Sequence, residues 1–174
     1  MSFALSSGRL LGAVALVLTV TASPATALAE AGPRAPGAVA ASSSRSGPGK
    51  AALSPALKRE LARVNEARAA HDRKPLRVSG CLTTKVAQPW AVHLADIQDL
   101  VHRDLDKVFE MCPGFSRLGE NIAYGYATPA AVVRAWMHSP GHRKNLLNRR
   151  YKRIGLGLAT TPDGTKYWVQ NFGG

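Results

Sequence analysis

An acidic side chain and a histidine stand where turn and cap chemistry would hold them firmly, in the stretch from Gly119 to Leu147. Glu120 lies between a glycine and an asparagine in an apolar segment, and a buried carboxylate must be satisfied by backbone amides or by a cation. His142 follows Ser139-Pro140, which are typical N-cap and N1 residues of a helix. The positive end of that helix disfavours protonation. A neutral imidazole there is free to bind a ligand.

The sequence contains no motif that identifies a nucleophile. Neither a G-x-S-x-G elbow nor an HExxH helix occurs. Ser116 and Ser139 are explained more simply as a loop residue and a helix cap. Catalysis is therefore left open by the sequence.

Two helices precede this stretch. Ser54-Pro55 predicts the start of the first helix. The second is predicted from near Cys81 to His102, and Pro89 should kink it or split it in two. His102 would then interact with the dipole at the helix end. Apolar residues recur at helical spacing in both: Leu57, Leu61 and Val64 in the first, and Leu82, Val86, Trp90, Leu94, Ile97 and Val101 in the second.

Strand patterns surround the last two helices. Residues 118–126 predict a short buried strand, and Thr128-Pro129 predicts the start of a helix that carries Trp136. Residues 154–159 and 165–172 alternate as two strands, with the turn sequence Thr161-Pro162-Asp163-Gly164 between them. Helices outside and a small antiparallel sheet inside give an α+β domain.

The N-terminal segment predicts export. Residues 1–29 have the basic, apolar and small-x-small parts of a signal peptide. Residues 30–52 are rich in Ala, Pro, Gly and Ser, which is typical of a linker. Residues 53–174 have the length of one domain. We therefore expect a secreted, extracellular protein with no membrane span after signal removal.

Export also bears on the cysteines and the charge. Cys81 and Cys112 are the two cysteines of the chain, and an oxidising compartment predicts a disulfide between them. The formal net charge is +12. In an exported protein this favours anionic envelope polymers or lipids over nucleic acid, although a generally basic surface explains it as well. Arg149-Arg150-Tyr151-Lys152-Arg153 is the densest basic run.

Several motifs together resemble the bacterial branch of the CAP superfamily, also called SCP. They are Gly-Glu-Asn-Ile-Ala at 119–123, Trp-Met-x-Ser-Pro-Gly-His-Arg-x-Asn-Leu-Leu at 136–147, Ile-Gly-x-Gly at 154–157 and Tyr-Trp-Val-Gln-Asn-Phe-Gly at 167–173. The resemblance covers residues 53–174. It implies a CAP-type α-β-α sandwich with a small antiparallel sheet between helices.

The resemblance also implies a cleft with two histidines and two acids. His102, Glu120 and His142 match its pattern, but Ser139 stands where the second acid is usual. The three matching groups could hold a divalent cation such as zinc, or could form a structural hydrogen-bond network. His138 is adjacent to Ser139 and is interpreted as a surface residue.

Two classes of function follow from the resemblance. Related domains bind sterols, fatty acids or proteins, which favours a non-catalytic binding module for an envelope lipid, polymer or protein partner. Proteolysis has been proposed for parts of the family, so the alternative is a metal-dependent extracellular hydrolase acting on esters or peptides.

Overall fold

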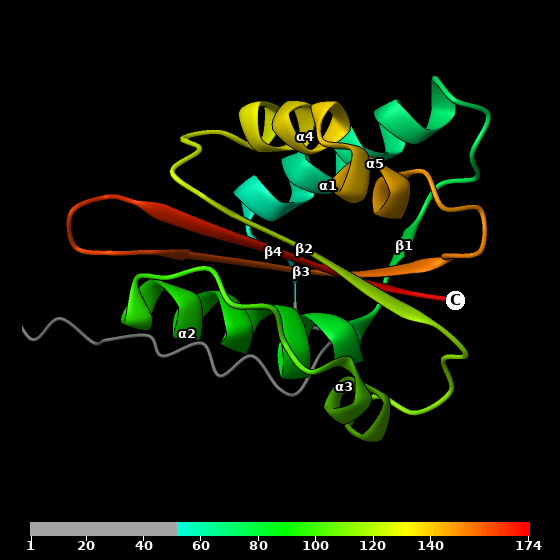
Figure 1. Cartoon of the computed structure of the whole chain (residues 1–174). Coiled ribbons are helices and arrows are strands. Elements are labelled where there is room, and N and C mark those ends of the chain that lie inside the picture. Colours follow the sequence, from blue (N-terminus) through cyan, green and yellow to red (C-terminus); the bar gives the residue numbers. More distant parts are fainter. Residues whose placement is uncertain (1–51) are drawn as a thin grey trace, which may run out of the picture. The chain divides into compact units, whose positions relative to one another are not determined.

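The computed structural model describes residues 52–174. The predicted signal peptide, 1–29, and all but the last residue of the predicted linker lie outside this part of the chain. Figure 1 shows a central sheet with helices on both of its faces. The predicted α+β class and the three layers of the sandwich are therefore confirmed.

The sheet has four strands in the order β1-β3-β4-β2. The predicted hairpin is confirmed as β3 (Arg153–Thr160) and β4 (Lys166–Gly173), and β2 (Leu118–Tyr124) pairs antiparallel with β4. A strand that sequence patterns missed, β1 (Arg77–Val78), pairs parallel with β3. The sheet is therefore mixed rather than wholly antiparallel. Two residues are too few to show an alternating pattern.

Helices α1 (Pro55–Ala69), α4 (Pro129–His138) and α5 (Pro140–Leu146) cover one face of the sheet. Two of the three predicted caps form, because Ser54 Oγ accepts from the Leu57 amide and Thr128 Oγ1 accepts from the Ala131 amide. Trp136 and Trp168 lie in the core between these helices and the sheet. α1 also buries two ionisable residues, Glu60 and Arg68, which were not predicted in the core.

The opposite face carries a π-helix at Leu82–Ala87, η1, followed by α2 (Gln88–Ile97) and α3 (Leu105–Met111). Pro89 stands in the first turn of α2, where η1 passes directly into α-helix, so the helix changes type near Pro89 but is not split in two. The second helix was predicted to reach His102, and this was wrong, because α2 ends at Ile97 and Gln98 follows with a φ of 52°. His102 consequently lies in the loop before α3 and not at a helix end.

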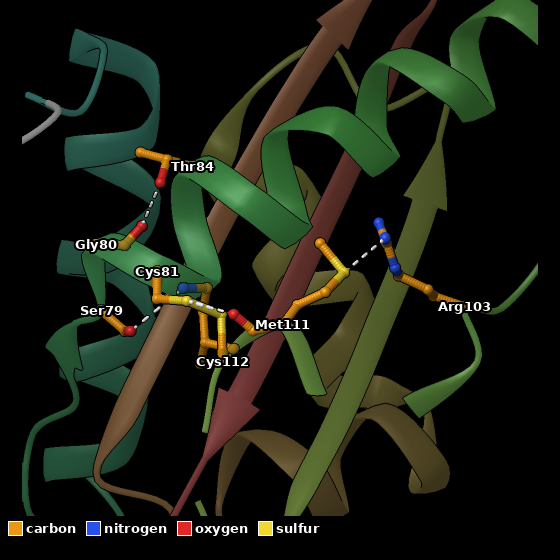
Figure 2. The surroundings of a disulfide bond; sticks show 8 residues. Ser79, Gly80, Cys81, Thr84, Arg103, Met111 and Cys112 are labelled. Carbon is orange, nitrogen blue, oxygen red and sulfur yellow. Dashed lines mark hydrogen bonds between the residues drawn. A yellow bond between two sulfur atoms is a disulfide. The ribbon is translucent and has the colours of Figure 1, made fainter. Parts of the chain in front are cut away.

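The predicted disulfide ties α3 to the start of η1. Cys81 and Cys112 are joined with a Cα–Cα distance of 5.9 Å, as Figure 2 shows. That separation lies within the usual range for a disulfide. The bond fixes the far end of α3 and so limits the freedom of the loop that carries His102.

Two glycines bring η1 and α2 close to the sheet. A Cβ at Gly155 would meet the backbone of Leu82, and one at Gly157 would meet the carbonyl of Ala87. The Ile-Gly-x-Gly motif therefore allows helix backbone to lie directly on β3. Of the helices described, none is long and apolar enough to cross a membrane.

Candidate ligand-binding cleft

Glu120 lies on β2, where its side chain is almost fully buried, with 6% of the residue exposed. Its Oε1 accepts from His102 Nδ1 at 2.8 Å and from the Arg103 amide at 3.0 Å. Its Oε2 accepts from Asn171 Nδ2 at 3.1 Å, from the neighbouring strand β4. Both carboxylate oxygens are thus satisfied by the protein itself, as a buried carboxylate requires.

The loop that carries His102 is held by contacts on both sides. Trp90 Nε1 donates to the Val101 carbonyl at 3.1 Å. The Arg103 guanidinium lies over the Trp90 ring, 5.1 Å from its centroid, and reaches Met111 Sδ at 3.2 Å. Trp90 belongs to the apolar series predicted for the second helix, yet it is only half-buried, and besides packing against the core it holds this loop. Sequence periodicity could not show this, because the contacts are made outside the helix.

His142 lies in the first turn of α5, where the sequence placed it. Its Nδ1 is 2.8 Å from Ser139 Oγ. Ser139 is at the N-cap position, but its hydroxyl is used by this imidazole and makes no side-chain capping bond. Burial lowers the pKa of His142, and the positive charge of a protonated His102 lowers it further. His142 is therefore neutral at pH 7.

A hollow of ≈ 260 Å³ adjoins His142. Trp136 and Ser139 line it from α4 and the turn to α5, while Leu100, Tyr124 and Tyr126 line it from the loop after α2 and from the end of β2. The last three residues are exposed by 36%, 56% and 36% of their areas. Apolar groups with a few polar atoms are the usual lining of a ligand site.

A chain of buried amides connects this cleft to α1. Gln170 Nε2 donates to Glu60 Oε1 at 2.9 Å, and Asn121 Nδ2 donates to Gln170 Oε1 at 3.2 Å and to the His142 carbonyl at 3.3 Å. Asn145 Nδ2 donates to the Glu120 carbonyl at 3.0 Å. These bonds fix α5, which carries His142, against β2, which carries Glu120. Sequence reasoning did not identify this network.

The structure brings His102 and Glu120 into direct contact, while His142 bonds Ser139 and is affected by His102 through its charge. His138 is exposed and bonds the Arg134 carbonyl at 2.7 Å, as expected of a surface residue. Of the residues that the structure describes, no group of three or more His, Cys, Asp or Glu side chains could hold a metal ion. The observed network joins His102, Glu120 and Asn171, and His142 stands outside it on Ser139.

Comparison with known proteins agrees with this arrangement. The model of the CAP family, described as the cysteine-rich secretory protein family, matches residues 61–172. The chain belongs to the CAP family. Glu120, His102 and His142 all fall inside the matched region, as do both cysteines.

Bacterial CAP proteins are among its relatives. YkwD of Bacillus subtilis is 36% identical over 105 residues, which are 57% of this chain and 39% of YkwD. An outer surface protein of Borrelia burgdorferi superposes with a TM-score of 0.62 at 25% identity, covering 67% of this chain and 90% of the Borrelia chain. An extracellular SCP-domain protein of Bacillus anthracis superposes with a TM-score of 0.56 at 28% identity. The match covers 66% of this chain and 39% of the Bacillus anthracis chain. The CAP chain thus spans about two fifths of YkwD.

Proposed function

We propose that this CAP domain is exported and acts as a non-catalytic binding module for an amphipathic envelope lipid. The observations that carry the proposal are the imidazole of His142, which lines an aromatic hollow, and the imidazole of His102, whose charge acts on His142. Within residues 52–174, each ring uses Nδ1 for a protein contact and leaves Nε2 without a partner. The signal-like segment 1–29 supports export, as does the likeness to a Borrelia burgdorferi protein that is named for its place on the outer surface.

The two Nε2 atoms offer different chemistry to a ligand. His102 donates from Nδ1 to the Glu120 carboxylate, so its Nε2 carries a lone pair when the ring is neutral. The hydroxyl of Ser139 can donate to His142 Nδ1 or accept from it, so His142 Nε2 can present either a proton or a lone pair. A hydroxyl or carboxyl headgroup matches this pair.

The hollow suits one end of a ligand and not a whole one. Its volume is below the roughly 300–1,000 Å³ usual for sites that enclose a drug-sized molecule. Leu100, Tyr124 and Tyr126 extend the apolar lining to the protein surface. The polar head would lie at the imidazoles and the apolar part along these exposed side chains.

A divalent cation would have two protein ligands in this cleft. His102 and His142 would hold it by Nε2, while Glu120 would orient the His102 ring, because both of its oxygens already accept hydrogen bonds. When bound, the cation would bind the oxygen of a headgroup. Two imidazoles without a third protein ligand favour weak, pH-dependent binding.

The experiment compares His142→Ala with His138→Ala as a matched control. His138 is a nearby histidine, but it is exposed and bonds its own helix. Fluorescence titration with cis-parinaric acid and with its alcohol measures binding. For the acid, whose carboxylate is charged, we expect at least about tenfold weaker binding by His142→Ala, because a hydrogen bond to a charged group is worth roughly 1.5–3 kcal/mol. We expect no change for the control. Equal binding by all three proteins would refute the proposal.

The same proteins separate binding from hydrolysis. Ester and peptide substrates are incubated with the purified chain, with and without a chelator. The proposal expects no turnover. Turnover that the chelator abolishes and that His142→Ala loses would replace it with the metal-dependent hydrolase.

A further inference from the structure

Two adjoining hollows on another part of the surface are lined mainly by cations. The first, of ≈ 760 Å³, includes Arg73, Arg143, Lys144 and Arg150. The second, of ≈ 820 Å³, includes Arg73, Lys74, Arg77, Arg149, Lys152 and Arg153. We call these nine side chains the basic surface. Arg73 lines both hollows, and the one acidic residue among their lining residues is Asp72, in the second hollow.

A buried arginine holds the two halves of the basic surface together. Arg68 donates from Nε to the Lys74 carbonyl at 2.8 Å, and from Nη1 to the Leu146 carbonyl at 2.6 Å and the Asn148 carbonyl at 3.2 Å. Arg73 Nε adds a bond to the Leu147 carbonyl at 3.0 Å. The segment after α1 and the segment after α5 are therefore fixed relative to each other. The hollows between them are built features of the fold.

The cations of the basic surface are not neutralised by the protein. The ion pairs found within residues 52–174 are Arg63–Glu66 and His102–Glu120, and neither includes a member of the basic surface. The register of β1 and β3 even places Arg77 beside Arg153. Like charges directly opposite one another destabilise a sheet. An external anion would remove that repulsion.

We infer that the basic surface binds a linear polymer that carries phosphate groups. Six of its nine cations are arginines, whose planar guanidinium groups match phosphate oxygens in pairs. Eight are exposed and Arg73 is half-buried, so they can contact several phosphates in succession but do not enclose a single one. The inference concerns a surface separate from the cleft at His142.

The lining of the hollows favours this class over single-stranded nucleic acids and over membrane surfaces. Nucleic acids bound as single strands stack their bases on aromatic rings. Tyr151, which lines the second hollow, is buried, stacks on Phe172 and donates to the Leu118 carbonyl. Membrane-surface binding adds apolar side chains that insert. The exposed large apolar residues of the described chain lie on α2, on the loop after it and on and just after β2, away from the basic surface.

The probe is linear polyphosphate, and the change is the triple variant Arg149→Gln/Arg150→Gln/Lys152→Gln in the full chain. All three side chains are exposed and make no hydrogen bond or ion pair within residues 52–174, so the fold should tolerate the change. The matched control removes two arginines and one lysine from other exposed positions: Arg59→Gln/Lys85→Gln/Arg134→Gln.

Calorimetry at several NaCl concentrations measures both affinity and its salt dependence. We expect the triple variant to bind polyphosphate at least about tenfold more weakly than wild type at roughly 150 mM NaCl. The slope of log Kd against log salt concentration should fall by about two to three, because each lost phosphate contact lowers that slope by about one. The control should keep the wild-type affinity and the wild-type salt slope. His142→Ala should also keep both, and this result would separate the inference from the proposal for the cleft.

Three results would overturn the inference. Equal weakening in the triple variant and the control would show that net charge alone attracts the polymer. Equal affinity per phosphate for inorganic phosphate and for polyphosphate would show a single-anion site. Tighter binding of a single-stranded oligonucleotide, or of vesicles containing an anionic lipid, would assign the basic surface to that class of partner.

Discussion

A buried carboxyl in α1 makes the stability of this CAP domain depend on pH in an unusual direction. Glu60 is fully buried, its Oε1 accepts from Gln170 Nε2, and its Oε2 has no partner among the described residues. Burial raises the pKa of Glu60 to about 8, against a smaller opposing effect of the bond from Gln170. The folded protein therefore holds this group as a neutral acid at pH 7.

The pKa difference sets the size of the effect. The pKa in the unfolded chain is taken as 4.5. Below that pH both states hold the proton, and the group adds no pH dependence. Between pH 4.5 and 8 the unfolded chain releases the proton while the folded protein keeps it, so the free energy of unfolding falls by about 1.4 kcal/mol per pH unit. From pH 5 to pH 7.5 the loss is about 3 kcal/mol, and it levels off above pH 8.

Glu60→Gln removes the titration and keeps the shape. Its carbonyl oxygen can still accept from Gln170, and its amide group replaces an oxygen that already lacks a partner among the described residues. Urea unfolding at about pH 5, 6.5 and 7.5, with the disulfide intact, gives the free energy of unfolding of each protein. The free energy of unfolding of the variant minus that of wild type should rise by about 3 kcal/mol between the lowest and the highest of these pH values.

Glu66→Gln is the matched control, because Glu66 is an exposed glutamate on the same helix. The free energy of unfolding of Glu66→Gln should differ from that of wild type by nearly the same amount at each pH, because the exposed Arg63–Glu66 ion pair contributes little. A Glu60→Gln difference that is the same at all three pH values would show that Glu60 is ionised in the folded protein, and the reasoning would fail.

Three other predictions concern the fold and the cleft. Gly157→Ala should lower the free energy of unfolding in urea by roughly 1–3 kcal/mol, because a Cβ would press on the Ala87 carbonyl. At Gly80 a Cβ meets no atom, so Gly80→Ala should lower that free energy far less, and equal losses would contradict the close packing at Gly157. Cys81→Ser/Cys112→Ser should lower the free energy of unfolding by about 3–4 kcal/mol, and an unchanged value would refute this. The NMR titration of His142 should give a pKa below 6.5, and a pKa above it would disprove the burial argument.

Sequence patterns predicted the parts of this fold that are governed by local rules. Ser54 and Thr128 form the expected caps, because cap chemistry depends on neighbouring residues. The β3–β4 hairpin follows from alternation and a strong turn sequence. The disulfide followed from having two cysteines and an expected oxidising compartment.

The parts that were missed depend on long-range contacts. The helix was extended to His102 because Ile97 and Val101 continue the apolar spacing, yet they are exposed by 43% and 46%. Gln98 ends the helix in a left-handed conformation that periodicity cannot indicate. Strand β1 exists only through its pairing with β3. Glu60 had a usable signal, since it lies at i+3 from Leu57 and i−4 from Val64 on the buried face.

The residues of the candidate site stay a prediction, and their geometry could not be predicted from the sequence. The motifs indicated His102, Glu120 and His142, and the structure places His102 on Glu120. The hydroxyl of Ser139 was expected to cap α5, but it bonds His142 instead. Whether a hydroxyl caps a helix or bonds a side chain depends on the packing of that side chain, here against Trp136.

The central claim is that His102 and His142 present their Nε2 atoms to one ligand site. Nitrogen NMR of the histidine rings, during titration of the purified chain with cis-parinaric acid, tests it directly. We expect the Nε2 resonances of His102 and His142 to shift together with a single Kd while that of His138 stays in place. Shifts that give different Kd values, or no shift at either ring when the probe binds, would contradict the claim.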